Sequence, residues 1–338
     1  MFIDLISDTV TKPTAKMLQA MFNAKVGDDI FGEDPTINEL EQKTAELFGM
    51  EAGIFCPSGT MTNQIAIKVH TKPGDDIICA EKAHIYQYEG GGIAFNAGCS
   101  VGLIPADDGK FGVKEFLQRI QPDDIHKPQS TLLEIENTTN KGGGAIWKFE
   151  EMKALSVAAR ENGIAFHMDG ARFFNAHVEE KYDLKAVGGL FDSISICLSK
   201  GLGAPVGSVL IGSKVFIKQA RRIRKVFGGG MRQAGYLAAA GIYALNNNIE
   251  RLKTDNDRAK ELASILSNKP FVKKAYPVHT NILIFQLREE VDDKAFIQSL
   301  SDKGVRGILM GKNLIRFVLH LDVSEDHFIE LKRILKDL

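Results

Sequence analysis

The sequence lacks the features that mark several large classes of protein. It has only four cysteines in 338 residues, and no two of them form a Cys-x-x-Cys pair, which argues against a zinc ribbon or a disulfide scaffold. We expect no metal site and a reducing, cytoplasmic location. With 42 Lys and Arg against 43 Asp and Glu, the net charge is −1, so a dominant nucleic-acid surface is not expected.

Long apolar runs are also absent. The longest charge-free stretches, 90–106 and 233–249, are rich in small and polar residues and fall short of the roughly 20 apolar residues that a membrane span needs. Residues 1–5 contain an acid and no basic or long apolar region, which is not typical of a signal peptide. We therefore expect no membrane partner.

Between residues 52 and 212, short apolar runs alternate with amphipathic segments of helical length. Nearly continuous apolar runs are typical of strands that are covered on both faces in a mostly parallel sheet. The alternation predicts a doubly wound α/β domain. The expected strands are Gly53–Cys56, Asp76–Ala80, Ser100–Pro105, Ser130–Glu136, Ile164–Met168, Ser193–Leu198 and Ser208–Ile211.

The pattern changes near residue 250. An Ala-rich helical stretch over 232–266, broken near 246–248, is followed by strand patterns over 281–287 and 314–319 and by helical patterns over 292–302 and 324–335. This change predicts a second, small α+β domain. We expect a large domain over 1–250, including the N-terminal segment, and a small domain over 251–338.

Three short segments carry residues that suit one cofactor. Lys200 follows one predicted strand, Asp169 ends another, and Ser58-Gly59-Thr60 follows a third and opens a helix. Open α/β sheets bind ligands beyond the carboxyl ends of their strands, and a helix N-terminus binds phosphate. An amine for a Schiff base, a carboxylate for a pyridinium and an anion site are what pyridoxal phosphate requires. Each segment alone is also typical of a surface lysine, a turn or a helix cap, so the combination supports the prediction.

One further motif suggests a different cofactor. Gly201–Gly207 resembles a dinucleotide fingerprint, but its spacing is one residue too long and Pro205 interrupts it. The fingerprint must open a helix, whereas Ser208–Gly212 is predicted to be a strand. A nicotinamide site is therefore disfavoured.

Longer motifs resemble the L-threonine aldolase family. The resemblance runs from Ile3 to about Asp326 and implies the aminotransferase-like, fold type I architecture, with a mostly parallel seven-stranded sheet and a small C-terminal domain. The motifs are Ser7–Thr11, Val26–Asp29 with Gly32–Thr36, Met168–Arg172, Cys197–Gly207 and Gly228–Gln233.

The resemblance implies roles for individual residues. Lys200 would bind the cofactor covalently, Asp169 would pair with its ring nitrogen, His84 would stack on the ring and His126 would lie near the substrate hydroxyl. A homotetramer built from dimers with shared sites is also implied. Ser58, Gly59 and Thr60 would bind the phosphate, together with Lys225 and Arg232 of a neighbouring subunit, and Ser7, Arg172 and Arg316 would bind the substrate carboxylate, with Arg172 also near the cofactor.

The basic run Arg221–Lys225 has a second interpretation. Apart from Lys225, its basic residues are expected to form a solvated helix face, with a nucleic-acid patch much less favoured.

The implied activity is cleavage of L-threonine or L-allo-threonine to glycine and acetaldehyde. The base that takes the β-hydroxyl proton is left open between His84 and a water held by His84 and His126. A different pyridoxal-phosphate lyase or racemase, or a non-catalytic protein that binds vitamin B6, is an alternative on the same fold.

Overall fold

A computed structural model describes residues 1–338, the whole chain. Its larger part is built on one sheet of seven strands. The strands are β2 (Ala52–Cys56), β3 (Asp76–Ala80), β4 (Ser100–Ile104), β5 (Ser130–Glu136), β6 (Ala165–Gly170), β7 (Ser193–Cys197) and β8 (Ser208–Gly212). Their order across the sheet is β2-β8-β7-β6-β5-β3-β4, and β8 runs in the opposite direction to the other six strands.

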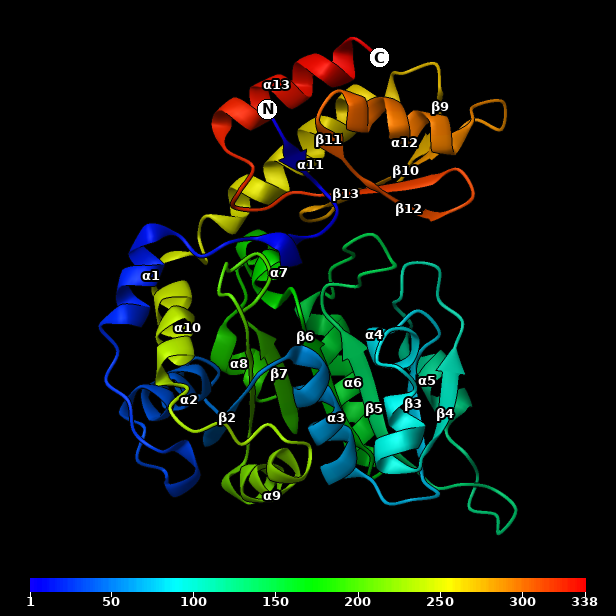
Figure 1. The fold of residues 1–338 in the computed structure, drawn as a ribbon. Helices are drawn as coiled ribbons and strands as arrows, with labels where there is room; N and C mark the ends of the chain where they lie inside the picture. The colour runs from blue at the N-terminus through cyan, green and yellow to red at the C-terminus, as the bar shows by residue number, and fades with distance from the viewer.

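Helices cover the sheet on both faces, so β3, β7 and β8 are buried along their whole length (Figure 1). Asp34 caps the second helix by accepting hydrogen bonds from the N–H groups of Thr36 and Ile37, with Pro35 in the first helical position. The helices are α1 (Ala15–Phe22), α2 (Pro35–Leu47), α3 (Gly59–His70), α4 (His84–Gln87), α5 (Val113–Arg119), α6 (Phe149–Glu161), α7 (Phe173–Glu180), α8 (Leu184–Gly188), α9 (Lys214–Val226) and α10 (Gly235–Asn247), with short turns η1 (Asp8–Val10), η2 (Asp29–Phe31) and η3 (Ile93–Ala97).

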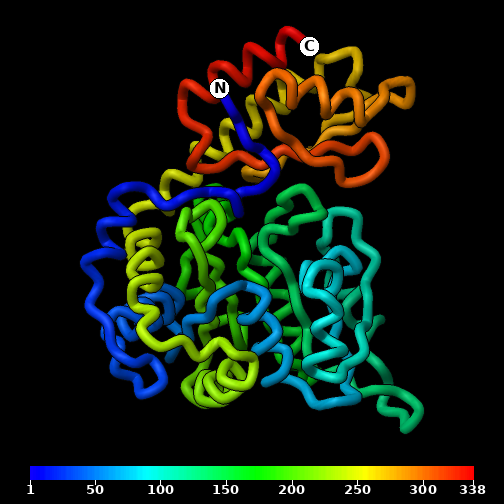
Figure 2. Tube along the Cα trace, viewed as in Figure 1, coloured from blue at the N-terminus to red at the C-terminus, as the bar shows by residue number.

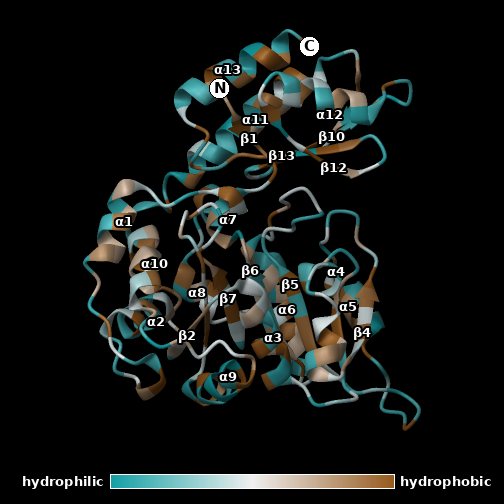
Figure 3. Ribbon diagram, in the orientation of Figure 1, coloured by the Kyte–Doolittle hydropathy of each residue, from teal (hydrophilic) through white to brown (hydrophobic).

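The C-terminal part has a four-stranded antiparallel sheet in the order β12-β13-β10-β9. Its strands are β9 (Val272–Ala275), β10 (Ile282–Leu287), β12 (Ile308–Gly311) and β13 (Leu314–Val318), and its helices are α11 (Leu252–Ser267), α12 (Asp293–Asp302) and α13 (Glu325–Lys336). Hydrophobic residues occur in the elements of both parts (Figure 3), and the two largest buried apolar clusters lie one in each part. The helix α11 joins them, because Leu252 belongs to the larger cluster and Leu262 to the smaller one.

The N-terminal segment packs differently from our expectation. Strand β1 (Ile3–Asp4) pairs in parallel with β11 (Val305–Arg306), and Figure 2 shows the N-terminus beside the C-terminal helix. Ile3 and Leu5 are buried in the small cluster. Residues 1–5 therefore pack with the C-terminal part rather than with the large one, and a two-residue strand is too short to predict from its pattern.

The predicted α/β architecture is otherwise confirmed. All seven strands of the large sheet were predicted to within two residues. The Ala-rich stretch is two helices, α10 and α11, that are separated at 248–251. The segment after Gly201–Gly207 is strand β8, antiparallel to β7, so the fingerprint helix is absent. No helix has the length and apolar character needed to cross a membrane.

Candidate active site

The candidate residues meet at the carboxyl ends of neighbouring strands. Asp169 lies at the end of β6, Lys200 follows β7, and Glu136 ends β5, which is directly paired with β6 at Asp169. Lys200 and Arg172 line the same small cavity. The order of the strands brings together residues that are far apart in the sequence, as in other open α/β sheets.

A single amide from α3 fixes two acidic side chains of the site. Asn63 Nδ2 donates to Asp169 Oδ2 at 2.8 Å and to Glu89 Oε1 at 2.9 Å. The backbone N–H of Ala171 donates to Asp169 Oδ1 at 3.0 Å. Asp169 is buried, and both of its oxygens accept a hydrogen bond, so the carboxylate is held in one orientation with acceptor capacity to spare.

His84, at the start of α4, is bound to the same group of acids. Its Nδ1 lies 3.1 Å from Glu89 Oε1, and its ring lies 5.6 Å from that of Tyr88. Burial alone would lower the pKa of His84, but the hydrogen bond to Glu89 and the charges of Asp169 and Glu136 outweigh it and raise the pKa. With Nδ1 bonded to Glu89, Nε2 is the nitrogen that is left for a ligand.

The pKa of Glu136 depends on its burial and on the charges around it. Burial and the nearby Asp169 raise its pKa to about 7, while His84, Lys200 and Arg172 act in the opposite direction. The site therefore concentrates both signs of charge in a buried volume, where their interactions are stronger than in water.

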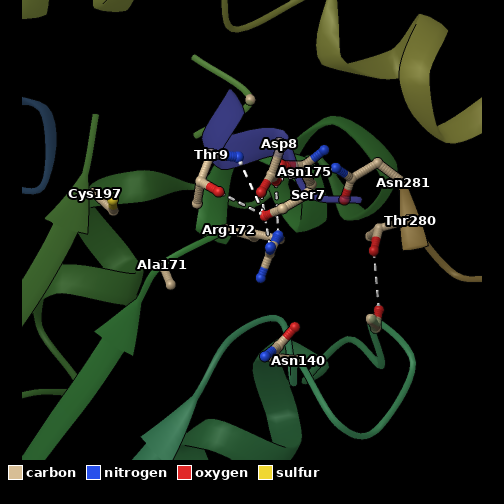
Figure 4. A network of polar contacts seen from close by, with 12 residues as sticks. Ser7, Asp8, Thr9, Asn140, Ala171, Arg172, Asn175, Cys197, Thr280 and Asn281 are labelled. Carbon is tan, nitrogen blue, oxygen red and sulfur yellow. Dashed lines mark hydrogen bonds and ion pairs between the residues drawn. The ribbon is translucent and has the colours of Figure 1, made fainter. Parts of the chain in front are cut away.

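Arg172, the last residue of the Met168–Arg172 motif, has a buried partner that the sequence did not reveal. Its Nε and Nη2 donate to Asp8 Oδ2 and Oδ1, each at 2.8 Å (Figure 4). Burial would raise the pKa of Asp8, but Arg172 outweighs it and lowers that pKa to about 2. Ser7 lies beside this pair and caps η1, with its Oγ accepting from Thr9. Asp8 therefore fixes the guanidinium in place.

Arg316 on β13 brings a second guanidinium to the same region. Its Nη1 donates to Asn140 Oδ1 at 2.9 Å and its Nη2 to the carbonyl of Ile6 at 3.0 Å, while its buried Nε has no partner. Burial and the positive charge of Arg172 lower the pKa of Arg316. Asp8 pairs with Arg172, whereas Arg316 donates to no carboxylate, so an additional anion would be stabilised here.

The start of α3 is suited to a phosphate. Ser58 caps the helix by accepting from the N–H of Met61 at 3.1 Å, and Thr60 is exposed in the first turn. A Cβ on Gly59 would meet only Cys197 Sγ, at 3.9 Å, so the helix terminus is open to a ligand. Unpaired N–H groups and the helix dipole favour an anion at such a terminus.

The predicted cations near this terminus are exposed. Lys225 is exposed, and Arg232 is an exposed side chain that donates to Asp28 Oδ2 at 2.9 Å. Their loop lies close to α3, because a Cβ on Gly229 would sit 2.2 Å from Met61 Sδ. Neither residue contacts the predicted phosphate-binding residues within this chain, so their role stays a prediction.

The expectation of a solvated face for α9 was wrong at Arg224, whereas Arg221 and Arg222 are exposed. Arg224 is buried, with Nη2 on Asp29 and Nη1 on the carbonyl of Phe55, and Arg221 pairs with Glu41. Helical spacing places both on the side of α9 that packs against the protein, where buried acids neutralise them.

The structure does not bring His126 to the other residues. It lies on an exposed loop before β5, where its Nδ1 is 2.7 Å from Asp124 Oδ1. The other residues follow the opposite end of that sheet, and a strand of this length spans roughly 20 Å. A contact of His126 with substrate would therefore need a second chain, and it stays a prediction.

Several residues of the site were missed from sequence. Glu136 had a signal that could have found it, because the pattern Leu132-Leu133-Glu134-Ile135-Glu136 places acids in an otherwise apolar strand, whereas the others lie in segments without such a pattern. The missed residues are Asp8, Asn63, Glu89, Glu136 and Asn140.

Comparison with known proteins agrees with this architecture. The structure of a threonine aldolase from Leishmania major superposes with a TM-score of 0.86 at 22% identity and covers 99% of each chain, which shows the shared fold. Residues 4–290 match the β-eliminating lyase family. The chain thus has the fold of the fold type I class of pyridoxal-phosphate enzymes.

Closer relatives define the family. The low specificity L-threonine aldolase of Escherichia coli (strain K12) is 43% identical over 330 residues, 97% of each chain. The probable low-specificity L-threonine aldolase 2 of Arabidopsis thaliana is 42% identical over 330 residues, 96% of this chain and 93% of that protein. This chain belongs to the low-specificity L-threonine aldolase family.

Proposed function

We propose that this protein is an aldolase that cleaves L-threonine and L-allo-threonine to glycine and acetaldehyde with pyridoxal phosphate as its cofactor. The observation that carries the proposal is that Lys200 and Arg172 meet at the same sheet edge as the buried Asp169, where all three act on the charge of Glu136. An amine, a fixed carboxylate and a cationic site are thereby within reach of one small amino acid.

The residues present fit the cofactor. Asp169 has acceptor capacity beyond its hydrogen bonds from Asn63 and Ala171, which suits a protonated ring nitrogen. The open start of α3 at Ser58 suits the phosphate, and Lys200 supplies the amine that would hold the aldehyde group. When bound, pyridoxal phosphate supplies an electron sink for the bond that breaks at the α-carbon of the substrate.

The substrate carboxylate belongs at the two guanidinium groups. Arg316 has a buried Nε without a partner, and Arg172 is fixed by Asp8, so an incoming carboxylate would complete the hydrogen bonding. Ser7 lies beside Arg172 and can add a hydroxyl donor (Figure 4). Holding the carboxylate would fix the orientation of the substrate α-carbon toward the bound cofactor, and this orientation would select the Cα–Cβ bond for cleavage.

His84 supplies the base, directly or through a water. The β-hydroxyl loses its proton, the Cα–Cβ bond breaks as the aldehyde C=O forms, and the α-carbon takes a proton to give glycine. Glu89 holds Nδ1 of His84, so Nε2 is available to accept the hydroxyl proton. The raised pKa of His84 implies that activity falls at acid pH as this nitrogen becomes protonated.

The proposal extends to assembly and location. Lys225 and Arg232 are exposed, so they are free to bind a phosphate that is held by a neighbouring subunit. This exposure supports a homotetramer of dimers with shared sites. A cytoplasmic location is supported by four buried cysteines that are all free thiols.

The match to the β-eliminating lyase family makes β-elimination the alternative reaction. β-Elimination removes the α-proton and expels a group from the β-carbon, which yields a keto acid and ammonia. A non-catalytic protein that binds vitamin B6 would give no turnover at all.

A product assay on the four threonine stereoisomers distinguishes these activities. We expect acetaldehyde and glycine in equal amounts from the L-isomers, and no pyruvate or ammonia from L-serine. Lys200→Ala should abolish turnover and the adduct that borohydride fixes, whereas the matched variant Lys214→Ala, at an exposed position in α9, should keep both. Keto acid formation, or full activity in Lys200→Ala, would overturn the proposal.

A further inference from the structure

A line of hydrogen bonds continues from Asp169 away from the site. Asn63 Oδ1 lies 3.2 Å from His167 Nε2, and His167 Nδ1 lies 2.8 Å from Ser193 Oγ. Ser193 Oγ in turn lies 2.8 Å from His70 Nε2. Four side chains on α3, β6 and β7 thus connect Asp169 to the far end of α3.

The direction of every hydrogen bond in this line is determined. Asn63 must turn Nδ2 toward the carboxylates of Asp169 and Glu89, because carboxylates accept, so its Oδ1 accepts from His167 Nε2. A neutral His167 then has a bare Nδ1, which can only accept, so Ser193 donates to it. The Ser193 hydroxyl has a single proton, which it donates to His167, so Ser193 Oγ accepts a hydrogen bond from His70 Nε2.

Both imidazoles are neutral, as this assignment requires. His167 is fully buried, and burial lowers its pKa to about 3. Burial also lowers the pKa of His70 to about 4. His70 stacks on Phe216 with ring centres 4.6 Å apart and lines a surface groove of about 410 Å³. The line therefore starts at the protein surface and adds no positive charge near Asp169.

We propose that His70, Ser193, His167 and Asn63 form a one-directional hydrogen-bond relay that positions Asp169 as an acceptor for the cofactor ring. All four are positioning residues, since they act through Asp169 and touch neither cofactor nor substrate. The inference rests on the proposed function for the identity of the group that Asp169 meets.

The Ser193 hydroxyl is the point at which the relay can be reversed. Without it, His167 Nδ1 still has the Ser193 carbonyl within 3.1 Å, and it can bond there only by carrying the proton itself. His167 Nε2 would then be bare and would face the Asn63 oxygen. Asn63 would lose its donor, and its hold on Asp169 would weaken.

Nitrogen NMR of the histidine side chains tests the direction without any activity measurement. In the wild type with and without cofactor, His70 and His167 should both be neutral with the proton on Nε2. In Ser193→Ala, His167 should move to the Nδ1–H form. In the control Ser195→Ala, which removes a buried hydroxyl two residues along β7 that bonds to Thr62, His167 should not change. An Nδ1–H or doubly protonated His167 in the wild type overturns the relay.

Kinetics and cofactor binding test the consequence. In Ser193→Ala we expect about a tenfold weaker Kd for pyridoxal phosphate and a lower kcat, by analogy with outer residues that orient metal ligands. KM for threonine should stay unchanged, because Arg172 and Arg316 are untouched. At the surface end, His70→Gln keeps a donor toward Ser193 and should retain the wild-type cofactor Kd and kcat. His70→Leu removes the donor and should weaken cofactor binding and lower kcat, as Ser193→Ala does.

The outcomes separate the two proposals. A wild type that neither binds the cofactor nor releases acetaldehyde contradicts the proposed function, whatever the histidine spectra show. An active wild type in which Ser193→Ala and Ser195→Ala lose cofactor affinity equally contradicts the relay, since the loss would then reflect packing alone.

Discussion

At the scale of single residues, the site is organised by buried charges that are fixed by other buried charges. Asp8 neutralises Arg172, and Arg316 meets only an amide oxygen and a carbonyl. Glu134 is fully buried without a partner, and burial together with Asp169, Glu136 and Glu89 raises its pKa well above the usual range. Burial therefore favours the neutral form of Glu134, which would spare the site one more negative charge.

The pair of Asp8 and Arg172 gives a prediction for stability. Asp8→Asn should lower the free energy of unfolding by about 3 kcal/mol, because it leaves a buried guanidinium without its counter-ion. It should also raise KM for threonine, since Arg172 loses its fixed orientation. Urea unfolding and steady-state kinetics measure the two effects. Asp4→Asn is the control, because Asp4 pairs with an exposed Arg306 and such pairs contribute little.

The same pair has a defined pH dependence. The pKa of Asp8 falls from 3.8 to about 2 on folding. The contribution of ionised Asp8 to the free energy of unfolding is therefore complete above pH 3.8 and is lost as pH falls toward 2. That contribution is about 2 kcal/mol. The stability difference between wild type and Asp8→Asn should therefore narrow below about pH 4, and a difference that stays constant down to pH 2 would contradict the assignment.

At the scale of secondary-structure elements, α3 serves the site at more than one point. Its first turn presents Ser58 and open N–H groups to an anion, its middle turn places Asn63 on Asp169, and its last residue is His70. The end of a 12-residue helix lies roughly 18 Å from its start, so one rigid element links the proposed phosphate and ring regions to the surface groove.

The cap of α3 should contribute to both folding and binding. Ser58→Ala should destabilise the protein by about 1 kcal/mol through loss of the cap, and should weaken pyridoxal phosphate binding roughly tenfold through loss of a hydroxyl near the phosphate. Thr14→Ala is a matched control, because Thr14 caps α1 by accepting from Met17 N–H. Thermal unfolding and cofactor titration should show the stability loss in both variants and the binding loss only in Ser58→Ala. Equal cofactor affinity in the two variants would exclude Ser58 from the phosphate site.

At the scale of the whole molecule, the site depends on segments from both parts of the chain. Arg316 reaches it from the small sheet, and the segment that carries Ser7 and Asp8 crosses from the small part to the large one. Figure 1 shows this N-terminal segment running between the two parts. The proposed carboxylate site therefore needs the two parts in their observed arrangement.

Assembly should control cofactor affinity. If Lys225 and Arg232 bind the phosphate of a neighbouring subunit, dilution to monomers should weaken pyridoxal phosphate binding, and Arg232→Ala should weaken it in the assembled protein. Sedimentation velocity paired with cofactor titration measures this dependence. Arg222→Ala, an exposed arginine on α9, should have no effect. Tight binding by a proven monomer would contradict a shared site.

Part of this protein can be predicted from local sequence. Apolar runs and helix caps such as Asp34 locate the large sheet and its helices, because burial periodicity and capping are local properties. The motifs around Lys200, Asp169 and Ser58 indicate the sheet edge where ligands bind. The short strands β1, β9, β11 and β12 lack such a signal, and β9 is mostly exposed.

The sequence by itself determined the α/β class, the seven strands and the placement of Lys200, Asp169 and Ser58 at strand ends, since each depends on residues that are neighbours along the chain. Only the tertiary structure decided which buried polar side chains form hydrogen bonds with each other. Asp8 and Arg172 are 164 residues apart, and Asn63 and His167 are 104 residues apart. Such pairs form because the strand order and the N-terminal crossing bring them into one buried volume, where an unpaired polar group is too costly to leave.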